Sequence, residues 1–103
     1  MELTEVTLKM IIDSGLLKPN TIIYSDSNPL VNGKLTNEGS IVLTIDNITK
    51  TYFYPSGAAR FVVKVSVNGW IFWKVKVGNE MKQLSYFREL YKKSWFYKEI
   101  YWK

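Results

Sequence analysis

Two β-rich runs separated by a short polar pair occupy the middle of the sequence. From Ser40 to Ile45, isoleucine or leucine stands at every second position, which is the spacing of a strand with one buried face. Ile48 to Phe53 continues in β-branched and aromatic residues, and Asp46-Asn47 between the runs can form a two-residue reversal. The two runs predict an antiparallel hairpin, so the fold must contain a β-sheet.

Three other segments are predicted to be helices. Glu5 to Ser14 has apolar residues at helical spacing and is followed by the stop signals Gly15 and Pro19. Pro55 to Val62 begins with proline, which is favoured at the first position of a helix. Leu84 to about Lys103 has helical spacing again.

The predicted C-terminal helix is rich in aromatic residues. Its apolar face is expected to pack on the sheet and consists of Leu84, Phe87, Tyr91 and Trp95. Eight of the last eighteen residues of the chain are aromatic, so we expect the part from about 94 to 103 to expose apolar surface. Such a surface favours a partner chain or a homodimer.

The segment before the hairpin predicts shorter β-elements. Thr21 to Tyr24 reads as a brief strand. Residues 25–39 are dense in Ser, Asn, Pro and Gly, which predicts a loop with one or two short strands. Asn32-Gly33 and Asn37-Glu38-Gly39 are predicted turns within it.

The tryptophan-rich stretch from Trp70 to Val75 is predicted to be a strand that follows a turn at Asn68-Gly69. In a strand, Trp70 and Trp73 point to opposite sides. Trp70 is expected in the core, because large aromatic residues are mostly buried. Trp73 is either a second core residue or an exposed platform on which a base can stack, and the sequence leaves both open.

The order helix, strands, helix, strand, helix predicts the α+β class. With 103 residues, the chain is expected to form a small single domain over 1–103, with a helical extension at about 94–103. Apolar runs of four residues or fewer are far below the ~18 of a membrane span, and the acidic start differs from a signal peptide. We therefore expect a cytoplasmic protein with no membrane partner.

The residue types that are absent restrict the possible chemistry. The chain has no cysteine and no histidine, which excludes disulfides, thiolate nucleophiles and the commonest metal ligand and general base. The six glycines never fall in a phosphate-loop or dinucleotide spacing. Ser25 to Asn28 could offer oxygen ligands, but turn formation explains this stretch better. We expect no catalytic site, no metal and no cofactor.

Charge and aromatic residues are concentrated in the second half of the chain. The net charge is +5, but residues 1–46 carry −3 and residues 47–103 carry +8. Of the aromatic residues, only Tyr24 precedes Tyr52. A basic and aromatic half can attract an anionic polymer and offer stacking faces. The alternative, equally open, is that the aromatics form the core and the lysines solvate its outside.

Residues 54–59 form the start of the second predicted helix. Unpaired backbone N–H groups and the helix dipole favour an anion such as phosphate there, and Arg60 and Lys64 follow one and two turns onward. The alternative is a helix that packs tightly on the sheet through Ala58 and Ala59. Opposite faces of the helix can serve both roles.

Three motifs, in this order, resemble the RAMA domain, a name that stands for restriction enzyme and adenine methylase associated. They are Gly15-Leu16-Leu17-Lys18-Pro19, then Tyr54-Pro55-Ser56-Gly57-Ala58-Ala59, then Val67-Asn68-Gly69-Trp70 with Phe72-Trp73. The resemblance runs from about residue 5 to residue 92. It implies a small, non-enzymatic α+β module that binds DNA in a bacterial restriction–modification system, and that in some members reads methylated adenine.

The resemblance and the charge distribution together predict double-stranded DNA as the partner, with a methyltransferase or nuclease domain in the same or a neighbouring chain. The expected DNA contacts are Lys50, Ser56, Gly57, Arg60, Lys64, Asn68, Trp73, Lys74 and Lys76. Asn68 more simply holds the turn with its side chain. The alternative function is a protein-interaction or dimerisation module that uses the aromatic C-terminal helix. A small hydrolase would have only serines and lysines to offer.

Overall fold

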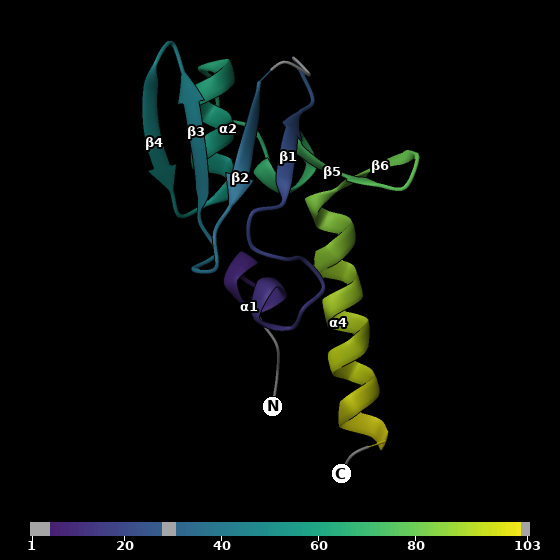
Figure 1. Cartoon of the computed structure of the whole chain (residues 1–103). Helices are drawn as coiled ribbons and strands as arrows, with labels where there is room; N and C mark the ends of the chain where they lie inside the picture. The colour runs from purple at the N-terminus through teal and green to yellow at the C-terminus, as the bar shows by residue number, and fades with distance from the viewer. Residues whose placement is uncertain (1–4, 28–30, 102–103) are drawn as a thin grey trace.

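The computed structural model describes residues 5–27 and 31–101, with side chains as far as Ser94. Within these residues, six strands form one antiparallel sheet in the order β4-β3-β2-β1-β5-β6 (Figure 1). The strands are β1 (Ile22–Ser25), β2 (Asn32–Leu35), β3 (Ile41–Ile45), β4 (Ile48–Tyr52), β5 (Trp73–Val77) and β6 (Glu80–Gln83). The described helices are α1 (Leu8–Asp13), α2 (Pro55–Val63), α3 (Gly69–Phe72) and α4 (Leu84–Tyr101). The predicted α+β class is confirmed.

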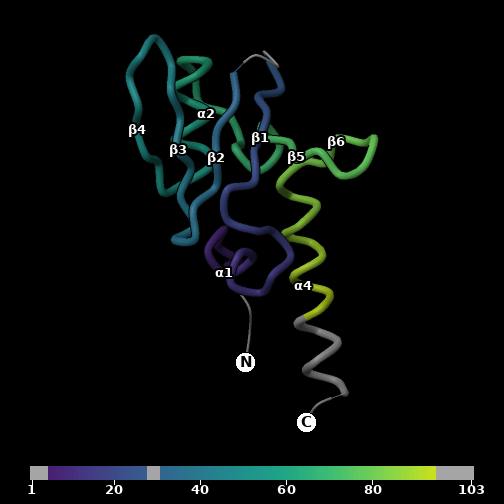
Figure 2. Tube along the Cα trace, viewed as in Figure 1, coloured from purple at the N-terminus to yellow at the C-terminus, as the bar shows by residue number. Residues whose placement is uncertain are grey.

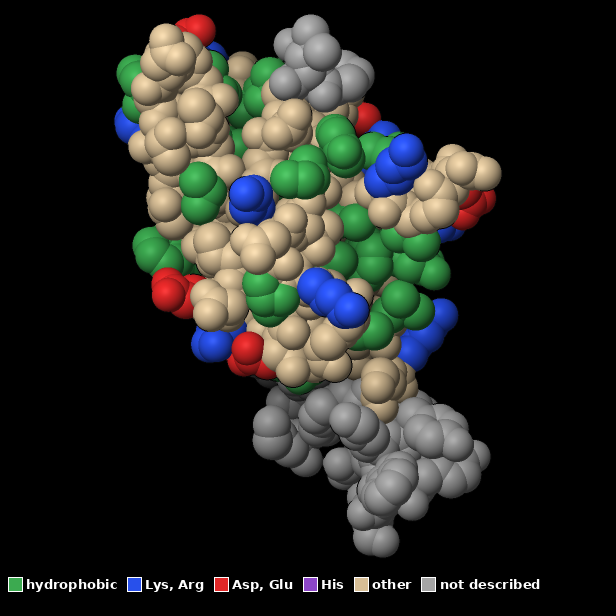
Figure 3. Space-filling model, viewed as in Figure 1, with side chains coloured by type: hydrophobic (Ala, Val, Ile, Leu, Met, Phe, Trp, Pro, Cys, Tyr) green, Lys and Arg blue, Asp and Glu red, His purple; other side chains and the backbone are tan. Residues whose placement is uncertain are grey.

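The sheet is covered on one face and open on the other. Leu35, Ile41 and Leu43 are fully buried, as are Ala58 and Ala59 of α2, which packs behind β3 and β4 in Figure 1. The alternation of a strand sends the intervening side chains to the opposite face. Figure 3 shows that open face, where lysine and apolar side chains lie among polar ones.

The β3–β4 hairpin has the predicted two-residue reversal. Asp46 and Asn47 have φ values of 53° and 65°, the two positive values of a type I′ turn. The turn at residues 37–39 is also confirmed. The predicted turn at Asn32-Gly33 is wrong, because Gly33 lies inside β2. A Cβ there would come within 2.7 Å of the Leu43 side chain, so the glycine makes room for a core residue.

The first two helices match the predicted segments with shifted ends. α1 begins at Leu8, later than expected, because Thr7 caps it: the Thr7 Oγ1 accepts a hydrogen bond from the Met10 N–H at 3.2 Å. α2 begins at Pro55 as predicted. It ends at Val63, and Lys64, whose φ of 66° is left-handed, caps its C-terminus.

The predicted strand from Trp70 is wrong in its first half. Gly69–Phe72 forms α3, a single helical turn, and the Asn68 Oδ1 caps it by accepting from the Trp70 N–H at 3.0 Å. β5 begins only at Trp73, so residues 70–73 do not alternate. Phe72 and Trp73 are both buried and meet edge to face, with ring centroids 5.0 Å apart. The sequence also did not predict β6, which pairs with β5.

α4 begins at Leu84 as predicted and continues to Tyr101. Leu84 and Phe87 are buried and Tyr91 is half-buried, whereas the side chain of Trp95 lies outside the described residues. The helix packs on α1 and α3 and reaches only the β5–β6 end of the sheet; Figure 2 traces α1 and α4 side by side. The predicted packing on the sheet is therefore only partly right. Within the described ranges, no helix is both long enough and apolar enough to cross a membrane.

Leu84→Ala and Phe87→Ala are each expected to lower the free energy of unfolding by about 2–5 kcal/mol, because each residue is buried where α4 meets the rest of the fold. Denaturant titration measures the loss. Glu89→Ala, on the exposed side of the same helix, serves as the control and should stay within about 0.5 kcal/mol of the parent. Equal stability of all three variants would contradict this placement of α4.

Candidate nucleic-acid interface

Two lysines from different elements converge on one aromatic ring. Lys50 lies on the edge strand β4 and faces α2, because its register partner is the core residue Leu43. The Lys50 Nζ lies 5.3 Å from the centroid of the Phe61 ring in α2, and the Lys64 Nζ lies 4.6 Å from the same centroid. Arg60 is exposed in the last turn of α2. We call Lys50, Arg60 and Lys64 the α2-edge cluster.

The α2-edge cluster carries unbalanced positive charge. In the part of the chain that the structure describes, none of its three side chains takes part in an ion pair. The cation–π contacts with Phe61 leave the ammonium groups at the surface, because Lys50 and Lys64 are both exposed. The cluster therefore presents three accessible positive charges at the surface.

Lys74 and Lys76 lie far from that cluster. Both are on β5, which three strands separate from β4, and both point to the open face of the sheet, opposite the core residues Trp73 and Val75. The Lys74 Nζ is already bound to the Asp26 Oδ1 at 2.8 Å. The structure thus divides the predicted phosphate contacts into two groups on different surfaces.

Three predicted contact residues hold the fold together. The Ser56 Oγ accepts a hydrogen bond from the Gly69 N–H at 3.0 Å, and Asn68 caps α3. Trp73 is fully buried, and its indole N–H donates to the Pro55 carbonyl at 3.0 Å. The interpretation of Trp73 as an exposed stacking platform is wrong, because its ring is enclosed between α2, α3 and the sheet.

The start of α2 is accessible on the side of Gly57. Gly57 is exposed, and a Cβ added there would meet only the Tyr52 ring, at 3.7 Å. On another side, Gly69 of α3 approaches the Pro55 carbonyl and the Ser56 nitrogen so closely that no side chain fits between them. An anion can therefore reach this helix start from the Gly57 side, but not between α2 and Gly69.

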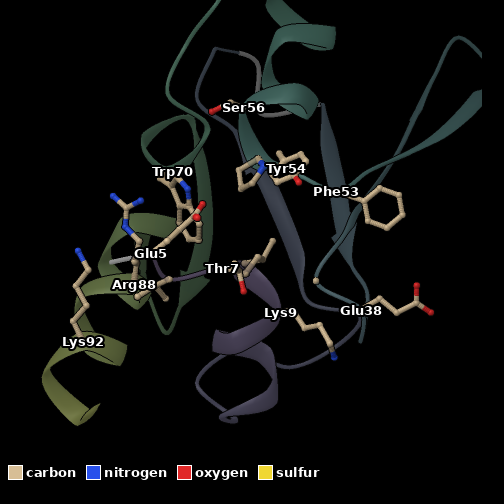
Figure 4. Close-up of a pocket in the computed structure, with 14 residues that line it drawn as sticks. Glu5, Thr7, Lys9, Glu38, Phe53, Tyr54, Ser56, Trp70, Arg88 and Lys92 are labelled. Atoms are coloured by element: carbon tan, nitrogen blue, oxygen red, sulfur yellow. The ribbon is translucent and has the colours of Figure 1, made fainter. Parts of the chain in front are cut away.

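A cavity of about 570 Å³ lies where the starts of α1 and α2 meet α3 and α4 (Figure 4). Its walls include Glu5, Phe53, Tyr54, Trp70 and Arg88. The sequence does not predict this site. Trp70 is expected in the core, whereas its side chain is only half-buried and lines the cavity. The sequence signal that could have indicated this site is the adjacent aromatic pair Phe53-Tyr54. In the structure these two residues are 64% and 73% exposed.

Arg88 is fixed in the wall of the cavity by an aromatic ring. Its Cζ lies 4.6 Å from the centroid of Trp70. Its Nε is buried and has no hydrogen-bond partner in the described part of the chain. Lys92, one turn further along α4, also lines the cavity but is paired with Glu89 at 3.6 Å.

The family model described as RAMA, Restriction Enzyme Adenine Methylase Associated, matches residues 3–95. The match covers nearly all of the described residues, including the α2-edge cluster and every residue named as part of the cavity wall. No curated protein matches the chain.

Proposed function

The chain belongs to the RAMA family, which is associated with restriction enzymes and adenine methylases, and from this premise we propose that it is a non-enzymatic module that binds double-stranded DNA. The supporting observation is the α2-edge cluster, in which two ammonium groups lie against one ring and the adjacent guanidinium is exposed. Cations of this kind bind phosphates and release the counterions of the duplex.

The module is further expected to recognise adenine methylation. A phosphate-binding surface carries no sequence information, so a module that serves an adenine methylase needs a second element that contacts bases. We propose that the module distinguishes methylated from unmethylated adenine and transmits this to a methyltransferase or nuclease domain. Its test is a comparison of affinity for duplexes that differ only in adenine methylation, at one salt concentration.

Changing Arg60 and Lys64 together to glutamine is expected to weaken binding to all duplexes alike. A plot of log affinity against log salt should lose about one unit of slope for each phosphate contact removed. Both residues are exposed, so each change should alter the free energy of unfolding by no more than about 0.5 kcal/mol. Fluorescence anisotropy across a salt series measures the slope.

The matched control changes Lys74 and Lys76 to glutamine, which removes the same charge from the open face of the sheet. If the α2-edge cluster carries the interface, the slope of this control remains that of the parent. A slope lowered only in the control would move the interface to the sheet. A slope unchanged in both variants would contradict phosphate binding by either group.

A further inference from the structure

The cavity wall contains a cation, Arg88, that has no ion-pair partner among the described residues. No ion pair in the described residues includes Arg88, and its buried Nε lacks a hydrogen-bond partner there. Proteins leave few buried donors in that condition, because each carries the cost of lost hydration. Trp70 holds the guanidinium plane in place at 4.6 Å. Arg88 is therefore held at the cavity wall without a bound acceptor among the described residues.

The other walls offer an aromatic face and a carboxylate. Figure 4 shows Tyr54 across the cavity from Trp70 and Arg88, with Glu5 near them. Tyr54 is 73% exposed, which leaves most of its ring free to stack. Glu5 is exposed and takes part in no ion pair of the described residues. A ligand that satisfies all three groups is planar and aromatic, and carries both an acceptor for Arg88 and a donor for Glu5.

We propose that this cavity binds one nucleotide whose base carries an amino group. The base stacks on Tyr54, the phosphate accepts hydrogen bonds from Arg88, and Glu5 accepts from the exocyclic amine, as carboxylates do from the amino group of cytosine. A volume of about 570 Å³ lies within the range of small-molecule sites, roughly 300–1,000 Å³.

The nucleotide has two possible sources with the same chemistry. One is a base turned out of a DNA duplex, and for this source the inference rests on the proposed function. The other is a free mononucleotide, which needs no DNA binding at all. Binding measurements with free nucleotides and with a duplex distinguish the two sources from each other, and from a cavity that binds neither.

Isothermal titration calorimetry with dAMP, deoxyadenosine and dTMP tests each group of the ligand. We expect dAMP to bind the full chain, and to bind about tenfold or more tightly than deoxyadenosine, which lacks the phosphate, or dTMP, which lacks the amino group. Arg88→Gln should abolish the preference for dAMP over deoxyadenosine, and Glu5→Gln the preference for dAMP over dTMP. Tyr54→Ala should weaken all three ligands about tenfold.

Two control variants outside the cavity test whether these effects are specific to it. Tyr86→Ala removes another exposed tyrosine, and Lys93→Gln removes a charge from the same helix as Arg88; neither residue lines the cavity, and both should leave dAMP binding unchanged. Equal loss in a control and its cavity variant would overturn the proposal. So would equal affinity for dAMP and inorganic phosphate, or no dAMP binding at millimolar concentration.

A duplex with 2-aminopurine at a mismatched position identifies the source, because leaving the stack costs least there and raises its fluorescence. A rise that Tyr54→Ala abolishes, at unchanged salt slope, assigns the cavity to an extruded base. Binding of dAMP without such a rise assigns it to a free nucleotide. If the parent chain binds dAMP but no duplex, the proposed function fails while the cavity site stands.

Discussion

Trp73→Ala is expected to lower the free energy of unfolding by about 3–5 kcal/mol. Trp73 is the largest of the fully buried side chains, and its ring meets Phe72 edge to face. Its indole N–H also satisfies the Pro55 carbonyl at the first turn of α2. Because folded proteins are stable by only about 5–15 kcal/mol, this loss is a substantial part of that margin.

Urea denaturation of two companion variants separates the parts of this effect. Trp73→Phe keeps most of the volume but loses the N–H donor, so its cost should fall between those of the parent and Trp73→Ala. Ile71→Ala, 49% exposed on α3, should stay within about 0.5 kcal/mol. A Trp73→Ala variant as stable as Ile71→Ala would show that the ring does not lie in the core.

Gly69→Ala is expected to destabilise the fold by about 3 kcal/mol or more. An added Cβ would lie closer than 3.0 Å to the Pro55 carbonyl and the Ser56 nitrogen. These are backbone atoms, so no side chain can rotate away and α2 and α3 must separate instead. Separation would also break the hydrogen bond from the Gly69 N–H to the Ser56 Oγ.

Gly57→Ala is the matched control and should have the opposite sign. Gly57 is also a glycine in the same pair of helices, but an added Cβ meets only the Tyr52 ring, at an ordinary 3.7 Å. Alanine is favoured over glycine within a helix by about 0.5–1 kcal/mol, so this variant should be more stable than the parent. Equal effects of the two substitutions would contradict the close contact of α2 and α3.

The parts of the fold that the sequence predicts depend on neighbouring residues. The alternation in β3, the Asp46-Asn47 reversal and the proline at the start of α2 are local signals, and the structure confirms all three. The prediction fails where a distant contact decides. Gly33 is a typical turn residue, but in β2 it makes room for the Leu43 side chain. Gly69 makes room for the Pro55 backbone, and residues 69–72 form the helix α3 instead of a strand.

For the candidate sites, too, the sequence predicts residue types but not their positions in the folded chain. Basic residues could be named from composition, but the register that turns Lys50 toward α2 and places Lys74 on the other face is a tertiary property. The cavity was beyond sequence reasoning, because its wall residues Glu5, Tyr54, Trp70 and Arg88 come from four separate segments. Trp73 was left undecided for a related reason: its burial depends on the packing of α2 and α3.

The strand order also bears on how the chain assembles as it is synthesised. Strand β1 pairs with β2, β2 with β3 and β3 with β4, all neighbours in sequence, whereas the pairing of β1 with β5 brings together residues as distant as Ile23 and Val75. Pairings between distant segments close slowly, because chain entropy opposes them. During synthesis on the ribosome, one edge of β1 stays unpaired until β5 has emerged. An unpaired strand edge can form hydrogen bonds with a strand of another chain. Aggregation during synthesis therefore depends on how quickly residues 55–77 follow the first four strands.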